Sequence, residues 1–206
     1  MAGVIAFVGD VHREFAKLAR LVGELPDGVE AVVQVGDLGL HPADLTSESR
    51  TATGWGRPLH FIGGNHDHEP WFRGLREPTE ICRNLIYVPR GIVMRLDQRR
   101  LAFLGGGDSI VDRARRREGI DWWAEEGVTA EDVARLKGAG PVDILVTHTP
   151  PAPVYPAFGY PPDPSALEVE RAWEMLGRPT LICGHLHRAR AVGVVRVLGE
   201  LEVLLM

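Results

Sequence analysis

The sequence has only two cysteines, Cys82 and Cys183, among its 206 residues, and no Cys-x-x-Cys spacing. Two cysteines cannot build a disulfide scaffold, so we expect both to be reduced and buried. The sequence also lacks any apolar run near the ~20 residues that cross a membrane. Its first apolar stretch, residues 4–8, has neither a basic segment before it nor a cleavage site. We therefore expect no membrane contact and a cytoplasmic location.

Positive charge is also scarce. The chain has 23 Lys and Arg against 28 Asp and Glu, a formal net charge of -5. This balance argues against a broad basic face for nucleic acid, so we do not favour that partner, although a local basic patch would permit it. The apolar share of 45% and charged share of 25% are typical of a globular protein and exclude a disordered or fibrous one. The length predicts one domain over residues 1–206.

Short apolar runs rich in β-branched residues recur along the chain and predict strands. They cover residues 4–8, 31–35, 59–62, 101–104, 144–146, 180–183, 192–197 and 201–205. Most of these runs are nearly continuous rather than alternating, which is typical of strands covered on both faces. Residues 87–103 predict a hairpin that turns at Asp97-Gln98. The fold class is therefore predicted to be α/β.

Three segments between the strands have helical spacing. Residues 15–25 carry apolar side chains three and four apart until Pro26 ends the pattern. A second helix is predicted from Thr129 to Gly138, and a third over residues 165–176, with Ser165-x-x-Glu168 as a capping box. Residues 40–57 and 150–164 lack periodicity, and segments of this length either form the wall of a site or are simple surface loops.

Polar residues with metal-binding side chains follow five of the predicted strands. In chain order they are Asp10 and His12, then Asp37, then Asn65, His66 and Asp67, then His148, and finally His185 and His187. In open α/β sheets, ligands bind beyond the carboxyl ends of the strands. We therefore expect these distant segments to converge on one rim.

The spacing and chemistry of these residues favour a metal site. Asp10 and His12 are two residues apart, as are His185 and His187, and in an extended backbone such residues point the same way. Each pair can therefore grip one ion. Glycines precede Asp10, Asp37 and other members of the set, and they permit backbone turns that a Cβ would obstruct. Oxygen and imidazole ligands without thiolate suit Mn, Fe, Co, Ni or Zn in a water-accessible catalytic site, which favours hydrolysis.

These five blocks resemble the signature of the calcineurin-like metallophosphoesterases. The blocks are Asp10-x-His12, Gly36-Asp37, Gly64-Asn65-His66-Asp67, His148 and Gly184-His185-x-His187, in this order. The resemblance implies a four-layer α/β/β/α sandwich of two mixed sheets, with a dimetal site at the C-terminal rim of the strands. It also implies two divalent ions, of which we favour manganese, and a small phosphate ester as substrate.

The resemblance further implies a role for each residue of the blocks. Asp10, His12 and His187 would hold the first metal, Asn65, His148 and His185 the second, and Asp37 would bridge both. Two such ions can share a hydroxide that attacks phosphorus in line. His66 would stay unligated and would protonate the leaving alkoxide or neutralise charge that develops on phosphorus.

Residues 85–126 resemble, at scattered positions, a prokaryotic and phage subgroup of these enzymes. If this segment is helical, Arg113, Arg116 and Arg117 share a face that could bind phosphate, or they form a solvated charge run. Arg13, directly after His12, is a second candidate for contact with phosphate, or an exposed arginine.

A comparison with the protein phosphatases of the family that the chain resembles narrows the predicted class of substrate. Serine/threonine phosphatases carry arginines beside their second and third blocks, where this chain has Leu38-Gly39-Leu40 and Gly63-Gly64. We therefore predict hydrolysis of phosphodiesters of nucleotide type. A phosphomonoesterase, a nuclease that works with a partner, and a noncatalytic scaffold stay open as alternatives, and the sequence leaves the oligomeric state open.

Overall fold

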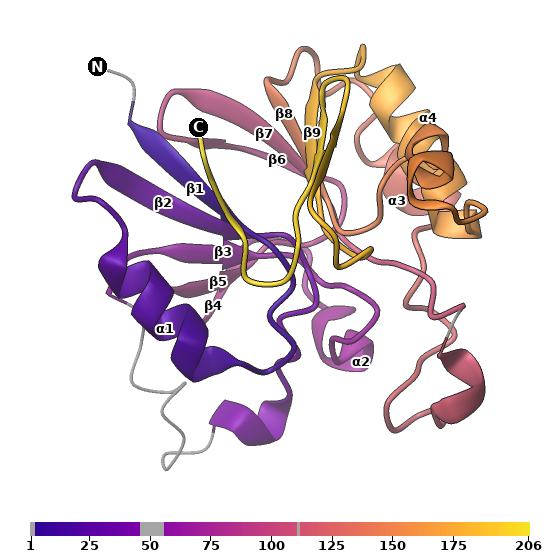
Figure 1. Cartoon of the computed structure of the whole chain (residues 1–206), viewed down its shortest axis with the longest axis horizontal. Coiled ribbons are helices and arrows are strands. Elements are labelled where there is room, and N and C mark those ends of the chain that lie inside the picture. Colours follow the sequence, from indigo (N-terminus) through magenta and orange to yellow (C-terminus); the bar gives the residue numbers. More distant parts are fainter. Residues whose placement is uncertain (1–2, 46–55, 111) are drawn as a thin grey trace.

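The apolar runs of the sequence form the strands of two six-stranded sheets that pack face to face (Figure 1). The computed structural model describes residues 3–45, 56–110 and 112–206. The predicted segment 40–57 therefore lies in part outside the described residues. Each sheet has four parallel strands in its middle and one antiparallel strand at each edge, so both sheets are mixed.

The first sheet contains the N-terminal strands and has the order β12-β1-β2-β3-β5-β4. Its strands are β1 (Val4–Val8), β2 (Val29–Gln34), β3 (Leu59–Phe61), β4 (Thr79–Cys82), β5 (Leu85–Tyr87) and β12 (Val203–Leu205). The C-terminal strand β12 therefore pairs with β1, the first strand of the chain.

The second sheet contains the rest of the strands and has the order β10-β11-β9-β8-β7-β6. Its strands are β6 (Ile92–Leu96), β7 (Arg99–Leu104), β8 (Ile144–Thr147), β9 (Thr180–Cys183), β10 (Arg190–Val192) and β11 (Val195–Val197). The β6–β7 pair is the predicted hairpin, and Asp97 in its turn has a φ of 53°.

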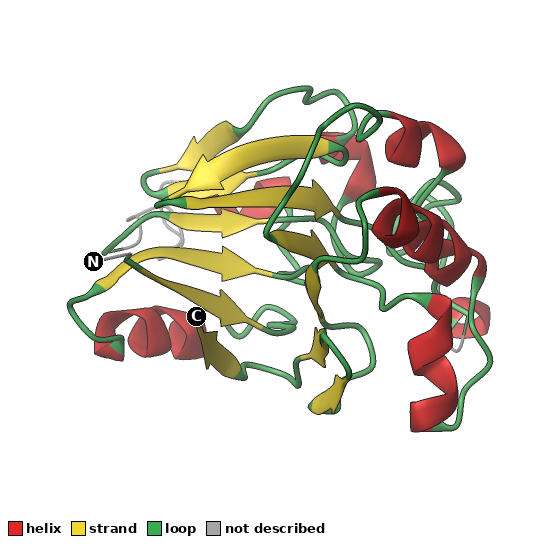
Figure 2. Cartoon of the chain, turned by 90° about the horizontal axis from the view of Figure 1, so that it is seen from above, coloured by secondary structure: helices red, strands yellow, loops and turns green. Residues whose placement is uncertain are grey.

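Helices cover the outer faces of the two sheets (Figures 1 and 2). The α-helices are α1 (Phe15–Glu24), α2 (Glu69–Phe72), α3 (Ala130–Ala134) and α4 (Pro164–Met175). The 3-10 helices within the described residues are η1 (Pro42–Leu45), η3 (Arg113–Arg115) and η4 (Ala152–Phe158). None of the helices within the described ranges is both long and apolar enough to cross a membrane.

Three clusters of buried side chains hold these layers together. Ile5 of the first sheet and Phe103 of the second belong to the cluster between the sheets. Leu18 of α1 packs on the outer face of the first sheet, and Val169 and Trp173 of α4 pack on the outer face of the second. The strands are therefore covered on both faces, which explains their nearly continuous apolar runs. The predicted four-layer α/β/β/α sandwich is confirmed.

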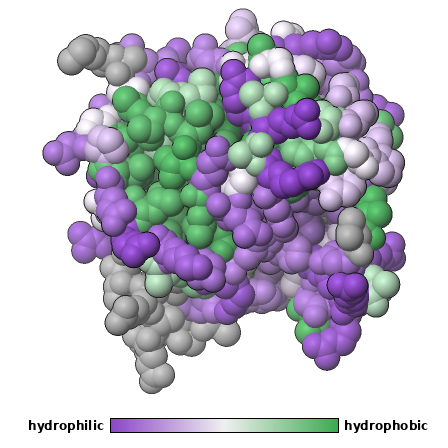
Figure 3. Space-filling model, in the orientation of Figure 1, coloured by the Kyte–Doolittle hydropathy of each residue, from purple (hydrophilic) through white to green (hydrophobic). Residues whose placement is uncertain are grey.

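The exterior is not uniformly polar. In the view of Figure 3, apolar side chains gather over the part of the fold where Figure 1 draws β1, β2 and the C-terminal end of the chain. Leu205, in the edge strand β12, is 45% exposed. Polar side chains cover most of the rest of this view.

Some local predictions were wrong. The run at residues 192–197 is not one strand, because it turns at Gly193 between β10 and β11. The third helix is capped by Asp163, whose Oδ1 accepts from the Ala166 N–H at 2.7 Å. Ser165, the predicted cap, instead accepts from the Val128 N–H at 2.8 Å. Pro164 at the first helical position explains the shift, since the residue before it is free to act as the cap.

Other local predictions were confirmed in full or in part. Thr129 caps α3 in a capping box with Asp132. Neither Cys82 nor Cys183 forms a disulfide in the described part of the chain, but only Cys183 is buried, while Cys82 is half-buried. The strands β4 and β5 were not predicted. They are only four and three residues long, and β4 begins with the polar pair Thr79-Glu80.

We predict that Phe103→Ala lowers the free energy of unfolding by about 3–5 kcal/mol, because Phe103 is fully buried between the two sheets. Urea denaturation followed by circular dichroism measures the change. Val194→Ala, at a residue 47% exposed, is the control and should change stability by less than about 0.5 kcal/mol. Equal stability of the two variants would show that the sheets are not held together by this core.

Candidate metal centre

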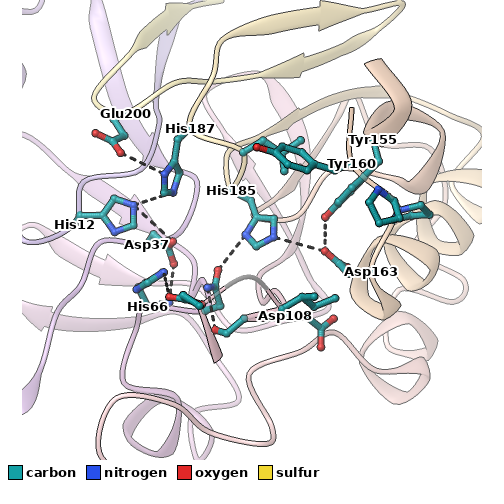
Figure 4. Close-up of a pocket in the computed structure, with 17 residues that line it drawn as sticks. His12, Asp37, His66, Asp108, Tyr155, Tyr160, Asp163, His185, His187 and Glu200 are labelled. Atoms are coloured by element: carbon teal, nitrogen blue, oxygen red, sulfur yellow. Dashed lines mark hydrogen bonds and ion pairs between the residues drawn. The ribbon is translucent and has the colours of Figure 1, made fainter. Parts of the chain in front are cut away.

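All five sets of predicted ligands follow the carboxyl end of a parallel strand. The strands are β1, β2 and β3 of the first sheet and β8 and β9 of the second. The sets meet where the ends of the two sheets converge, as the distances below show. Figure 4 shows His12, Asp37, His66, His185 and His187 of these sets gathered around one pocket. The predicted convergence on one rim is therefore what the fold produces.

Four of these residues form a first donor set. Asp10, His12, Asp37 and His187 each offer one ligand atom, and these atoms lie within 4.8 Å of one another. His187 Nε2 lies 3.0 Å from His12 Nε2 and 3.2 Å from Asp10 Oδ2. This first donor set could hold one metal ion.

Three further residues form a second donor set. Asn65 Oδ1 lies 3.1 Å from His148 Nε2 and 3.0 Å from His185 Nδ1, and the two imidazole nitrogens are 3.2 Å apart. Ligands bound at about 2.1 Å from one ion are separated from one another by roughly 3 Å. The second donor set therefore has the spacing of three ligands around one ion.

Asp37 lies between the two donor sets. Its Oδ2 is 3.9 Å from His12 Nε2 in the first set and 3.4 Å from His148 Nε2 in the second. This oxygen is fully buried, and no hydrogen-bond donor reaches it within the described part of the chain. A buried carboxylate oxygen without a partner is costly unless a cation binds it. The site therefore fits metal ions.

The imidazoles are oriented by hydrogen bonds and ion pairs on their far sides. His148 Nδ1 lies 3.0 Å from the carbonyl oxygen of Val35, to which it can donate, and this leaves Nε2 free to bind a cation. Asp163 Oδ2 lies 3.6 Å from His185 Nε2, and Glu200 Oε1 lies 3.3 Å from His187 Nδ1. Partners of this kind fix the tautomer of a metal-binding histidine.

Electrostatic coupling within the site shifts two pKa values strongly. Burial alone would raise the pKa of Asp37, but the imidazoles of His148, His66 and His12 hold it well below its usual range. Burial disfavours the charged form of His148, yet Asp37 and Asp10 outweigh it and raise its pKa to about 9. The buried carboxylates thus attract positive charge, which a bound metal ion supplies.

Backbone amides hold the carboxylates in place. The His185 N–H donates to both oxygens of Asp10, and the His66 N–H donates to Asp37 Oδ1 at 2.8 Å. Asp67 accepts from two further backbone amides and so joins the loops after β2 and β3. Its donors are the N–H groups of Gly39 and Gly64, both at 2.7 Å. Burial and the charge of Asp37 raise the pKa of Asp67 to about 7.

The turns that present the ligands are not extended. His12, Asp37, His185 and His187 all have positive φ values, between 46° and 70°. Such conformations are costly for residues other than glycine and persist where the surrounding structure enforces them. The expectation that spacing alone aligns each i, i+2 pair was therefore wrong for His185 and His187. The turn sends their side chains to different donor sets.

His66 lies beside the donor sets rather than within them. Its ring meets that of His12 edge to face, with centroids 5.0 Å apart. Its Nε2 lies 3.5 Å from Asp112 Oδ2. Burial lowers the pKa of His66, although the carboxylates of Asp37 and Asp112 act against this. The ring is half-buried and lines the pocket described below.

Arg13 and Arg113, the arginines predicted to bind phosphate, are both engaged in other contacts. Arg13 binds Asp44 in two contacts of 2.6 and 3.0 Å. Arg113 lies in the 3-10 helix η3, not in an α-helix, and its guanidinium stacks over Trp122 at 4.1 Å from the ring centroid. Arg116 is the arginine that the structure brings to the donor sets, where it donates to the Asn65 carbonyl at 2.7 Å.

A pocket of about 560 Å³ opens beside the donor sets. His12, Asp37, Asn65 and His66 line it on one side. Residues 160–163, from the predicted wall segment 150–164, line it on another, so this long segment does form a wall. Figure 4 shows His185 between Tyr160 and the His12–His187 pair.

Several contributing residues were missed at the sequence level. Asp163, Glu200 and Asp112 orient the three histidines His185, His187 and His66. Asp163 could have been found from its place before Pro164, at a helix start. Glu200 and Asp112 carry no local signal of their own, because each meets its histidine only through the fold.

The comparisons with known proteins agree with this geometry. The family model described as calcineurin-like phosphoesterase matches residues 3–189 of the chain. The matched range contains every residue of the two donor sets. No curated protein matches the chain.

We predict that Gly184→Ala lowers the affinity for divalent metal ions by about 10–100-fold, because a Cβ at this position would overlap the Asp10 carboxylate. Metal titration of the folded variant, with elemental analysis after dialysis, measures the loss. Gly23→Ala is the matched control, since a Cβ there meets nothing within 4 Å. Normal metal content in Gly184→Ala would contradict the close packing of Asp10 against this turn.

Proposed function

The chain belongs to the calcineurin-like phosphoesterase family and is a metal-dependent phosphoric ester hydrolase, and from this premise we propose that it hydrolyses small phosphodiesters at the two donor sets. The observation that carries the proposal is the position of the Asp37 carboxylate. One of its oxygens faces the first donor set and the second donor set at once, at 3.9 and 3.4 Å. A shared carboxylate of this kind suits two neighbouring cations.

We assign the first ion to the first donor set, and the second ion to Asn65, His148 and His185, with Asp37 shared. When bound, two divalent ions lower the pKa of water and neutralise phosphate oxygens. The protein's part is to keep the donor atoms in place. It does so through the backbone amides that bind Asp10 and Asp37 and through the carboxylates behind His185 and His187.

His66 is assigned as the acid that protonates the leaving group. It does not belong to either donor set, it lines the pocket, and Asp112 lies 3.5 Å from its Nε2. In the reaction, the oxygen of water forms a bond to phosphorus and the bond from phosphorus to the leaving oxygen breaks. The proton of the His66 imidazolium passes to that oxygen, while one proton of the attacking water is released to solvent and His66 afterwards takes up a proton from solvent. A diester and water thus give a monoester and an alcohol.

The contacts made by the nearby arginines favour diesters over monoesters as substrates. A monoester carries an additional negative charge, which needs cations beyond the metals. Arg13 is bound by Asp44, and Arg116 is bound by the Asn65 carbonyl, Ser109 and Asp112. Their positive charge is thus already paired within the fold.

The choice of manganese and a cytoplasmic location stay predictions.

We predict that His66→Ala lowers kcat by roughly 10²–10⁴ without loss of metal, because the residue transfers a proton and holds no ion. Steady-state kinetics on a diester with a poorly acidic alcohol, together with elemental analysis, test this. The loss should shrink with a nitrophenolate leaving group, which needs little protonation. His68→Ala, which removes a ring that packs on Trp123, is the control and should keep kcat within about twofold. Loss of metal from His66→Ala would refute the assignment.

We also predict that the manganese-loaded protein cleaves bis(4-nitrophenyl) phosphate with a higher kcat/KM than 4-nitrophenyl phosphate. Release of nitrophenolate measures both rates, and removal of metal with a chelator should abolish them. Asp37→Asn should lose both metal and activity, since the shared carboxylate is removed. A preference for the monoester would overturn the choice of diesters, and absence of hydrolysis of either ester would overturn the proposed function.

A further inference from the structure

The pocket beside the donor sets has a wall that the reaction does not require. Outside the donor sets, the residues that line the pocket include Ile110, Tyr160, Pro161 and Pro162, all of which are exposed. Ile110 is 61% exposed and Tyr160 is 46% exposed. Large apolar side chains that are exposed inside a pocket indicate that a ligand with an apolar surface covers them when it binds. We call these four residues the apolar wall.

The shape and chemistry of the apolar wall favour a flat ring. Tyrosine and proline present flat apolar faces on which an aromatic ring can pack. The Arg188 guanidinium stacks on the Tyr160 ring, with its central carbon 5.7 Å from the ring centroid. Figure 4 shows Tyr160 and Tyr155 together on the side of the pocket next to Asp163. The volume of about 560 Å³ is within the range of pockets that enclose small organic ligands.

The negative charge of the pocket limits which substituents a bound aromatic ring can carry. Beyond Asp37, four carboxylates line it, and within the described part of the chain none of its lining residues is a lysine or arginine. The four are Asp108, Asp112, Asp163 and Glu200. An anionic substituent placed away from the donor sets would therefore meet these carboxylates, while the Arg188 guanidinium stacks on the Tyr160 ring and does not line the pocket. A second hollow, on the other side of His12 and His66, contains Arg13 and Arg116 instead.

We propose that the apolar wall is a specificity subsite that receives an aromatic ring without anionic substituents, attached to the phosphorus group held at the donor sets. This inference rests on the proposed function, because it places the phosphorus group at Asp37 and its neighbours. It narrows the substrate class to esters with an uncharged aromatic group. It also disfavours substrates with further phosphates on that side.

Binding of stable phosphonates tests the subsite without turnover. Calorimetry on the manganese-loaded protein compares methylphosphonate, phenylphosphonate and 4-carboxyphenylphosphonate. We expect phenylphosphonate to bind at least about tenfold more tightly than methylphosphonate, because the ring buries additional apolar surface. The carboxylate of the third compound should remove most of this advantage. Phenylphosphonate should also compete with bis(4-nitrophenyl) phosphate.

Variants of Tyr160 locate the effect. Tyr160→Ala should reduce the ratio of phenyl to methyl affinity to below about threefold, while Tyr160→Phe should keep the ratio. Leu167→Ala is the matched control, since Leu167 lies on α4 and is 47% exposed, close to the 46% of Tyr160, but does not line the pocket. Its ratio should equal that of the unchanged protein.

The outcomes separate the subsite from the proposed function. Equal affinity for the phenyl and methyl compounds, an advantage that survives Tyr160→Ala, or binding that does not compete with the diester would each overturn the subsite. If phenylphosphonate binds through Tyr160 but no ester is hydrolysed, the subsite stands and the proposed function is wrong. If esters are hydrolysed but the ring gives no advantage, the function stands and the subsite is wrong.

Discussion

The site depends on one buried carboxylate, that of Asp37. Its charge lies in the interior where the two sheets converge, with one oxygen bound by the His66 amide and the other without a hydrogen-bond donor in the part of the chain that the structure describes. An isolated buried charge of this kind is costly, so it constrains everything around it. Imidazoles gather about it and hold its pKa low, and two neighbouring cations would complete its surroundings.

The fold maintains this arrangement at a local cost in backbone conformational energy. Four of the seven ligand residues adopt left-handed backbone conformations. Gly64 and Gly184 let the chain pass close to Asp37 and Asp10. Such turns are unfavourable by themselves and persist because the strands before them are fixed in two packed sheets. The core between the sheets therefore serves the chemistry directly, since it sets where the ends of β1, β2, β3, β8 and β9 meet.

The surroundings of the site are asymmetric. On one side the pocket is acidic and apolar, with the Tyr160 segment as its wall, and on the other a hollow of about 310 Å³ contains Arg13, Arg116 and Trp123. His12 and His66 border both spaces. A phosphorus centre held between them would have groups of different chemistry directed to the two sides. In the proposed function, these two spaces would select the substrate and the donor sets between them would carry out the reaction.

The sequence by itself determined most of the strands, though not β4 and β5, together with the α/β class and the polar residues that follow five of the strands. Short apolar runs and the glycine-led turns after them are local patterns. Only the tertiary structure decided which side chains meet. It sends His185 and His187 to different donor sets, as the family resemblance implied but their two-residue spacing did not. It also brings Arg116 rather than Arg113 to Asn65. It also pairs Asp112 with His66 and Glu200 with His187. These contacts join residues that are far apart in the chain or depend on the path of a turn, and their positions follow from the packing of two sheets rather than from any local pattern.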